Sequence, residues 1–324
     1  MDRGFFRSRE FLVASLVGLL VVGGWAAALS YQAWQGPSLD RTSCDTEAFP
    51  GAAITPQVEE STTPAGLSTA QLEQRYVLPL GALQGGRADL CSEVGDLTIT
   101  ASPDDQIHLT VFTRATGPQA DALLREARVE VAFTQENGLL HLASRQRQGL
   151  DAWGFMAFVS HGLEVEMVLQ VPAAAGFNLS TRTDVGDVTL SDVTLGHLLV
   201  RTDVGDVTTR NVSLLGPTDV VTDVGTVSLD YPQVTGAIGV TTDVGEVRLL
   251  LPRDDRFGYH ATLRTDVGST TADLGPTSVH REEEDGASHR LEVRTANWES
   301  APTKVPIVVV TDVGDITLAT RNPT

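Results

Sequence analysis

The sequence is short of lysine, cysteine and aromatic residues, and these shortages exclude some classes of function. The chain has 324 residues and a formal net charge of −19, and Lys304 is its only lysine. Phosphate groups are bound chiefly by Lys and Arg, so this excess of acid argues against nucleic acid or anionic lipid as the main partner. The two cysteines, Cys44 and Cys91, fit no metal-ligand spacing. In an oxidising compartment they could form a disulfide, and two free thiols are the alternative.

The motifs of common enzyme classes are also missing. The sequence contains no HExxH, no GxSxG, no Walker loop and no GxGxxG that opens a helix. A single histidine on a strand, such as His197 or His260, is more typical of a satisfied side chain than of a metal ligand. We therefore predict no enzyme, no catalytic residue, no cofactor, no metal ligand and no small-molecule substrate. The seven histidines are His108, His141, His161, His197, His260, His280 and His289.

The N-terminal region contains one long apolar segment. Residues 11–29 carry no charge, and as a helix they would reach about 28 Å, close to the thickness of the hydrocarbon core. The arginines lie before this segment, at Arg3, Arg7 and Arg9, so residues 1–10 should stay in the cytoplasm. We predict a single-pass transmembrane anchor over 11–34, with the bulk of the chain extracytoplasmic, in the periplasm or at the cell surface. A cleaved signal segment is the alternative, and it would export the chain as well.

Composition changes twice after the anchor. Residues 35–72 are rich in Pro, Ser, Thr and acidic residues without apolar periodicity, which predicts a flexible linker. The folded body is expected over 73–324. Its first part alternates apolar and polar residues, as in LEVEMVLQVP, and this predicts mostly β structure with a short helical segment at 118–127.

The tetrapeptide TDVG occurs six times in the second half of the body. Its copies begin at Thr183, Thr202, Thr222, Thr242, Thr265 and Thr311. A period near 20 residues indicates a repeat architecture. The last interval is about twice the others, so we expect a degenerate copy at Arg294 and Thr295. An earlier echo, SEVGD, begins at Ser92.

Side-chain parity within one repeat predicts an all-β fold, a β-solenoid similar to a single-stranded β-helix. Leu198, Val200, Thr202 and Val204 should share the inward face, with Leu199, Arg201 and Asp203 outward. Apolar positions restart at Val207, and again at Val212 and Leu214, which gives three short segments per coil. One such coil buries too little to fold alone, so the coils must stack.

We interpret the tetrapeptide as a structural corner. In a type II turn, Asp184 would accept a hydrogen bond from the amide two residues ahead, and Gly186 would supply the positive φ. The fourth residue varies among Asp187, Asp206, Thr226, Glu246, Ser269 and Asp315, as a corner would allow. The leading threonines have inward parity and should stack as a hydrogen-bonded ladder.

The alternative interpretation is a carboxylate ladder that binds cations. Stacking would place Asp184, Asp203, Asp223, Asp243 and Asp266 about 4.8 Å apart. Ca²⁺ could offset their repulsion, but so could the outward-facing Arg182, Arg201 and Arg264. The glycine-rich nine-residue calcium repeat is missing. A Ca²⁺-binding or glycan-binding solenoid therefore remains an alternative, and no metal residue is assigned.

Two segments depart from the repeat. Residues 277–304 are expected to form a solvated loop or hairpin, and a protruding contact site centred on Trp298 is the functional alternative. Residues 148–162 contain Trp153, and we expect them to cap one end of the solenoid rather than to form an exposed apolar patch.

The strand LEVEMVLQVPAAAGFNLSTRTDVGDVTL and the TDVG copies after it resemble a bacterial putative-adhesin family. This family is a domain of unknown function with β-strand repeats, related to toastrack-type β-solenoids. The resemblance covers about 75–324, and where the family usually has Ser-Gly this chain has Val-Gly. It implies an extracytoplasmic β-solenoid without established catalytic residues. Together these observations predict a non-catalytic envelope scaffold or adhesion module whose partner is an envelope protein or surface polymer. A sensory or regulatory ectodomain of an envelope-stress system is the alternative.

Overall fold

The structure is a computed structural model whose described part consists mostly of strands. It describes residues 52–53, 57–64, 69–79, 86–104, 106–117, 120–121, 124, 129–136, 139–146, 163–174 and 176–322. These residues lie in one compact unit, Cys44–Thr324. The predicted anchor, 11–34, and the predicted cap, 148–162, are outside the described residues. Among the residues that are described, no helix has the length and apolarity needed to cross a bilayer.

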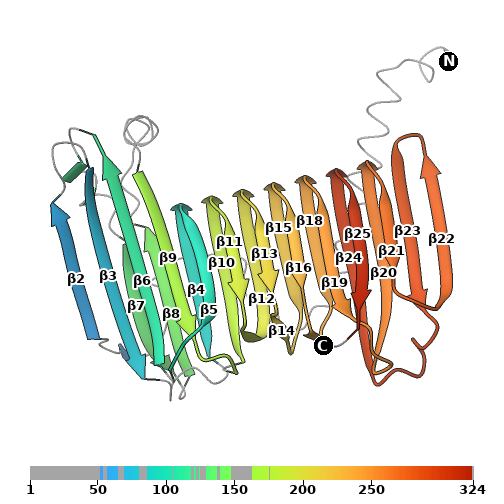
Figure 1. Cartoon of the computed structure of the whole chain (residues 1–324), viewed down its shortest axis with the longest axis horizontal. Coiled ribbons are helices and arrows are strands. Elements are labelled where there is room, and N and C mark those ends of the chain that lie inside the picture. Colours follow the sequence, from blue (N-terminus) through green and yellow to red (C-terminus); the bar gives the residue numbers. More distant parts are fainter. Residues whose placement is uncertain are drawn as a thin grey trace, which may run out of the picture. The chain divides into compact units, whose positions relative to one another are not determined.

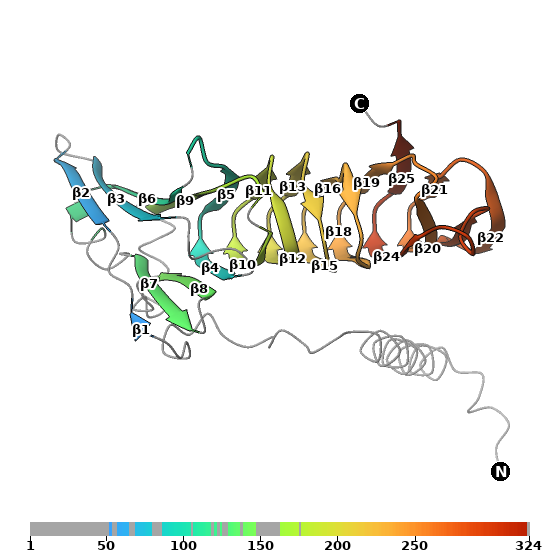
Figure 2. The ribbon, with the colours of Figure 1, turned by 90° about the horizontal axis from the view of Figure 1, so that it is seen from below.

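Two sheets face each other across one continuous core (Figures 1 and 2). The first sheet has 14 strands, and its main path runs in the order β1-β7-β8-β4-β10-β12-β15-β18-β24-β20-β23-β22. Its strands are β1 (Ala52–Ala53), β4 (Arg87–Val94), β7 (Val129–Glu136), β8 (Leu139–Gln146), β10 (Phe177–Val185), β12 (Thr194–Val204), β14 (Ser213–Leu214), β15 (Thr218–Val224), β17 (Gln233–Val234), β18 (Ile238–Val244), β20 (Phe257–Val267), β22 (Thr277–Asp285), β23 (Ser288–Thr295) and β24 (Thr303–Val313).

The second sheet has 11 strands in the order β2-β3-β6-β9-β5-β11-β13-β16-β19-β25-β21. Its strands are β2 (Gln57–Pro64), β3 (Thr69–Pro79), β5 (Asp96–Ala101), β6 (Gln106–Thr116), β9 (Leu163–Val171), β11 (Val188–Ser191), β13 (Val207–Arg210), β16 (Val227–Asp230), β19 (Val247–Pro252), β21 (Thr270–Asp273) and β25 (Ile316–Arg321). The prediction of an all-β solenoid is therefore confirmed.

Each coil passes from the first sheet to the second and returns through a short third side. One coil runs from β12 through a corner into β13, then through the two-residue β14 into β15. Successive coils pair in parallel with equivalent residues side by side, so that Thr202 lies beside Thr222 and Val204 beside Val224. The three predicted segments per coil are present, although the third is very short.

The inward face of each coil is aliphatic. Leu198 and Val200 on β12 and Val207 on β13 have no exposed surface, and Thr202 is 2% exposed. Val204 does not follow, because it is 47% exposed, and the prediction that it points inward is wrong. The alternation ends at Thr202, after which the chain leaves the sheet at the corner and both Asp203 and Val204 are exposed.

The order of the last coils differs from their order in the sequence. β24 pairs in parallel with β18 on one side and with β20 on the other, so the final TDVG copy lies between the fourth and the fifth. Figure 2 shows β24 between β18 and β20. The predicted degenerate copy at Arg294 and Thr295 is not a coil, because β23 runs antiparallel to β20 and forms a hairpin with β22.

Antiparallel strands extend the other end of the stack. The long strands β3, β6 and β9 pair antiparallel in the second sheet, and β9 then pairs in parallel with β5 of the first coil. Here the structure differs from the predicted linker over 35–72, because β2 and the start of β3 lie within it. β2 is polar and lies at the sheet edge, where backbone pairing with β3 holds it without an apolar face.

Two further predictions fall in this N-terminal half. Cys91 on β4 is 9% exposed and is disulfide-bonded; the other cysteine of the chain, Cys44, is not among the described residues. Within the predicted helical segment, 118–127, the described residues Ala120, Asp121 and Leu124 have helical conformation.

Candidate functional site

The six TDVG copies line up along one edge of the stack, where the first sheet turns into the second. We call the exposed Asp-Val pairs of these copies the corner ridge and each pair a rung. In spatial order the rungs are Asp184/Val185, Asp203/Val204, Asp223/Val224, Asp243/Val244, Asp312/Val313 and Asp266/Val267. The predicted neighbours Asp243 and Asp266 are therefore separated by Asp312.

The leading threonines form the inner side of the ridge, as predicted. All six are at most 2% exposed. Five hydroxyls donate to the glycine carbonyl of the preceding coil, as Thr202 does to Gly186 at 3.3 Å and Thr265 to Gly314 at 2.9 Å. Among the six, Thr242 Oγ1 has no hydrogen-bond partner within the described residues. The ladder therefore ties five of the six corners to the coil before them.

The glycines of the tetrapeptide are required for two reasons. Their φ angles lie between 149° and 159°, a region open essentially only to glycine. In addition, a Cβ placed on any of them would lie 1.8 to 2.2 Å from the backbone oxygen of the preceding glycine in the stack. The positive φ was predicted, but it is far from the value near 80° of a type II turn, so the predicted turn type is wrong.

The fourth residue of the corner forms a ladder that the sequence analysis did not predict. The carboxylate of Asp206 accepts a hydrogen bond at 2.7 Å from the amide of Thr226, its counterpart in the next coil. Asp96, Asp187 and Asp315 accept equivalent bonds at 2.8 to 2.9 Å. The hydrogen bond from the amide two residues ahead, predicted for Asp184 and its equivalents, occurs at none of the described corners. The fourth position could have been found by asking which side chain faces the amide above it.

The outer side of the ridge is a row of partly exposed valines. Their exposed fractions lie between 45% and 51%, and they are most of the large hydrophobic residues exposed in the described part of the chain. Because the coils pair in register, the valines follow one another at the strand spacing of about 4.8 Å. The ridge therefore presents an apolar row beside an acidic row.

Repulsion between rungs is visible in the pKa values of two aspartates. The pKa of Asp203 is raised by partial desolvation and by the charges of Asp184 and Asp223, against which Arg182 acts. The pKa of Asp312 is raised in the same way, by desolvation and by Asp243 and Asp266. A carboxylate surrounded by like charges holds its proton more tightly.

Among the described residues, arginines on the outward face form ion pairs only with the aspartates at the two ends of the ridge, and they act more weakly on the next aspartates inward, Asp203 and Asp312. Arg182 lies 3.6 Å from Asp184, and Arg264 lies 3.1 Å from Asp266. Arg201 makes no ion pair with Asp203 among the described residues. At the equivalent positions of the central coils, register places Val221, Thr241 and Val310.

The predicted contact site at Trp298 is partly buried rather than protruding. The indole meets the ring of His260 edge-on, with centroids 5.6 Å apart, and Lys304 Nζ lies 5.8 Å from its centroid. His260 also pairs with Glu292 at 3.1 Å, which satisfies it as expected. Residues 277–295 form the predicted hairpin at the end of the sheet. Trp298 therefore packs against residues at that end of the sheet, His260 and Lys304.

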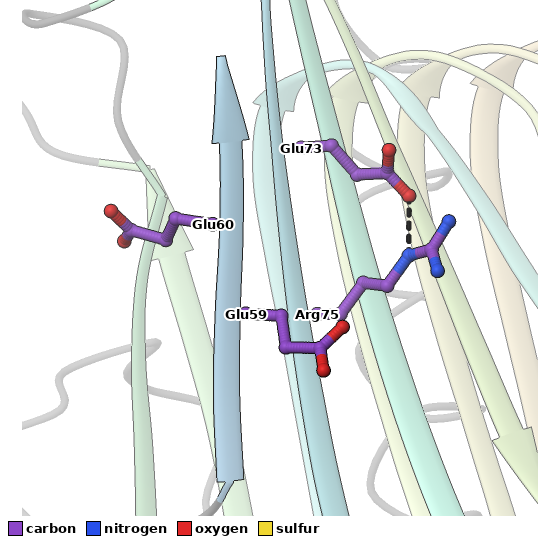
Figure 3. Close-up of a pocket in the computed structure, with 4 residues that line it drawn as sticks. All are labelled: Glu59, Glu60, Glu73 and Arg75. Atoms are coloured by element: carbon purple, nitrogen blue, oxygen red, sulfur yellow. Dashed lines mark hydrogen bonds and ion pairs between the residues drawn. The ribbon is translucent and has the colours of Figure 1, made fainter.

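Hollows and metal-compatible groups lie away from the ridge. A hollow of about 460 Å³ is lined by Glu59, Glu60, Glu73 and Arg75, where Figure 3 shows Glu60 directed away from the other three. Arg75 pairs with Glu73 at 2.5 Å. On the hairpin, Glu282, Glu284 and His289 bring their ligand atoms within 4.8 Å of one another, the one such group found in the described part of the chain. The two glutamates are exposed and His289 is half-buried, and exposed acidic groups are common without an ion.

Comparisons with known proteins found one matching family and several similar solved structures. A family model described as Toastrack DUF4097 matches residues 89–224 and again residues 175–319. A putative cell adhesion protein from Clostridium sporogenes ATCC 15579 is similar over 77% of this chain and 99% of its own, at 14% identity and a TM-score of 0.49. A putative adhesin from Bacteroides fragilis NCTC 9343 is similar over 76% of this chain and 96% of its own, at 13% identity and a TM-score of 0.32. The search of curated proteins returned no match.

Proposed function

The chain belongs to the Toastrack DUF4097 family, and from this membership we propose that it is a non-catalytic interaction module of the cell envelope. In this proposal residues 11–34 anchor it in a membrane, and the solenoid lies on the extracytoplasmic side. Its partner is an envelope protein or a surface polymer. The role is adhesion or scaffolding, in which the solenoid holds a contact surface at a distance from the membrane.

The observation that carries the proposal is the corner ridge. Six rungs in register repeat one exposed pair of residue types along the stack. Such a repeated linear surface suits a partner that is itself extended, because the same contact can form at each rung. A catalytic site would need a few residues set apart from the repeat, in a pocket that excludes water.

The stack also supplies the stiffness that such a role requires. Each coil is tied to the next by parallel backbone pairing, by the threonine ladder and by carboxylate-to-amide bonds. Strands in a solenoid contact only their neighbours, so stiffness extends along the array. The coils that carry the ridge are therefore held together without help from a ligand.

Placement and partner can be tested together in intact bacterial cells. A chain with a C-terminal epitope tag should sediment with membranes and should become sensitive to added protease once the outer envelope is permeabilised. The variant that lacks residues 11–34 should do neither. Cross-linking of the solenoid should capture an envelope protein or surface polymer. Protease resistance after permeabilisation, or cross-links to cytoplasmic proteins, would contradict the proposal.

A further inference from the structure

The three central rungs of the corner ridge combine acidic and apolar surface, and within the described residues no arginine lies at ion-pair distance from their aspartates. Arg264 acts on Asp312 only from the neighbouring coil. Asp223, Asp243 and Asp312 take part in no ion pair among the described residues. The arginines that pair with ridge aspartates, Arg182 and Arg264, lie on flanking coils. The placement of β24 produces this pattern, because it puts Asp312 and Val310 where sequence order would have put Asp266 and Arg264.

Each central rung sets a carboxylate directly beside a half-exposed isopropyl group. Val224, Val244 and Val313 are 46%, 47% and 45% exposed. Val221, Thr241 and Val310 lie on the other side of the aspartates, two residues earlier on the same strands. Both flanks of the acidic row are therefore largely apolar.

Lysine and arginine side chains fit such a rung better than other charged groups do. Their alkyl stems cover apolar surface while the charged head stays at its edge. A small inorganic cation would pair with the carboxylates but would gain nothing from the valines. Within the chain, Arg264 already forms an ion pair of this kind, since it lies on the outward face 3.1 Å from Asp266.

We propose that the central rungs bind an extended, basic polypeptide segment of an envelope protein. This inference rests on the proposed function and names its partner chemistry. A second copy of the ridge would be repelled, since it is equally acidic, and so would an anionic lipid surface. The three central rungs span about 10 Å at about 4.8 Å per strand, a length that about three extended residues cover.

A binding experiment with the full chain, kept soluble in detergent, tests this directly. The probe is a fluorescein-labelled peptide of about ten residues in which Arg alternates with Ala, and the readout is fluorescence anisotropy at low salt. The ridge variant D223N/D243N/D312N should weaken binding about tenfold, because exposed ion pairs each contribute modestly. The matched control E282Q/E283Q/E284Q removes the same charge from the exposed hairpin strand β22, and it should change binding less than about twofold.

A second variant separates a built surface from general attraction between opposite charges. V224T/V244T/V313T keeps every charge and nearly every atom position but makes the apolar row polar. It should weaken binding about threefold. Equal losses in the ridge and hairpin variants would overturn the proposal, because net charge alone would then account for binding. Unchanged binding by the valine variant would also overturn the proposal, because the peptide would then be held by charge attraction alone.

A melting experiment distinguishes weaker peptide binding from unfolding of the ridge variant, and the cross-linking experiment distinguishes failure of the ridge inference from failure of the proposed function. Removing neighbouring like charges should stabilise the stack, so the ridge variant should melt at or above the temperature of the parent chain. If the ridge variant still cross-links to its envelope partner in cells as the parent does, the ridge inference fails and the interaction module stands. If the parent chain captures no envelope partner, the proposed function fails.

Discussion

The parallel coils and the terminal hairpin β22–β23 show how differently two kinds of β structure restrict sequence. In the coils, a residue at the corner touches its equivalents in the coils before and after it, and Gly205 leaves no room for a Cβ. In the hairpin, Gly286 has φ of 66° and no atom within 4 Å of a Cβ. β22 pairs on one side only and is almost wholly exposed. TDVG is thus repeated because each corner stacks closely on its neighbours. The sequence of β22 can be irregular because this strand pairs on one side only.

The largest expected effect on stability comes from replacing a corner glycine by alanine, compared with the same change at the hairpin glycine. Gly205→Ala should destabilise the chain by about 3 kcal/mol or more, because φ of 156° and a 2.0 Å approach to Gly186 O both exclude a Cβ. Gly286→Ala should cost about 1 kcal/mol, for φ alone. Chemical denaturation of the full chain in detergent measures both. Similar costs for the two substitutions would contradict the stacking account.

The fourth-position ladder gives the next largest difference. Asp206→Ala removes the acceptor for the Thr226 amide and should cost about 1 kcal/mol, less than Gly205→Ala. Asp206→Asn keeps an acceptor oxygen and should cost less than the alanine variant. Glu283→Ala on the exposed strand β22 serves as control and should stay within about 0.5 kcal/mol of the parent. A cost for Asp206→Ala above that of Gly205→Ala would count against the corner account.

The aspartates of the ridge and the fourth-position aspartates beside it should respond to pH with opposite signs. The pKa of Asp203 is raised in the folded chain by desolvation and by its acidic neighbours, so folding loses stability as pH rises through the range between the unfolded and folded values. Asp203→Asn should therefore raise the melting temperature at pH 7, and the gain should vanish below about pH 4.

Asp315 is the matched opposite case. Hydrogen bonds from the side chain and amide of Ser269 lower its pKa, so it stabilises the fold above its unfolded pKa and loses this effect as pH falls through the lowered value. Asp315→Asn should therefore lower the melting temperature at pH 7. Thermal scans at pH 7 and about pH 3 test both variants. If both variants changed the melting temperature at pH 7 in the same direction, the expected difference between Asp203 and Asp315 would be contradicted.

The smallest expected effect is that of divalent cations on the ridge. Millimolar Ca²⁺ and Mg²⁺ should each raise the melting temperature only slightly and by the same amount, since screening of the aspartate row needs no specific geometry. The variant D223N/D243N/D312N should lose this small rise. A clearly larger rise with Ca²⁺ than with Mg²⁺ would instead favour the calcium-binding alternative.

Some features of the corner could be predicted from the sequence and others could not. Thr202 and Gly205 were assigned correctly because their roles follow from period-two alternation and from backbone sterics, which are local. Val204 was assigned wrongly because alternation was extended one residue too far into the corner. The bond from Asp206 to the Thr226 amide was missed because its two partners are 20 residues apart and meet only when coils stack.

The sequence by itself determined the unit of this protein: a coil of about 20 residues with inward aliphatic residues, a buried threonine and a glycine corner. Only the tertiary structure decided the order of the coils. The TDVG copies are locally interchangeable, so no local preference distinguishes which copy stacks on which. Pairing of β23 with the free edge of β20 and of β24 with its other edge settles the order over long range. That order places the rung with Arg264 at the end of the ridge and puts the rung of Asp312, which carries Val310 at the equivalent position, inside it.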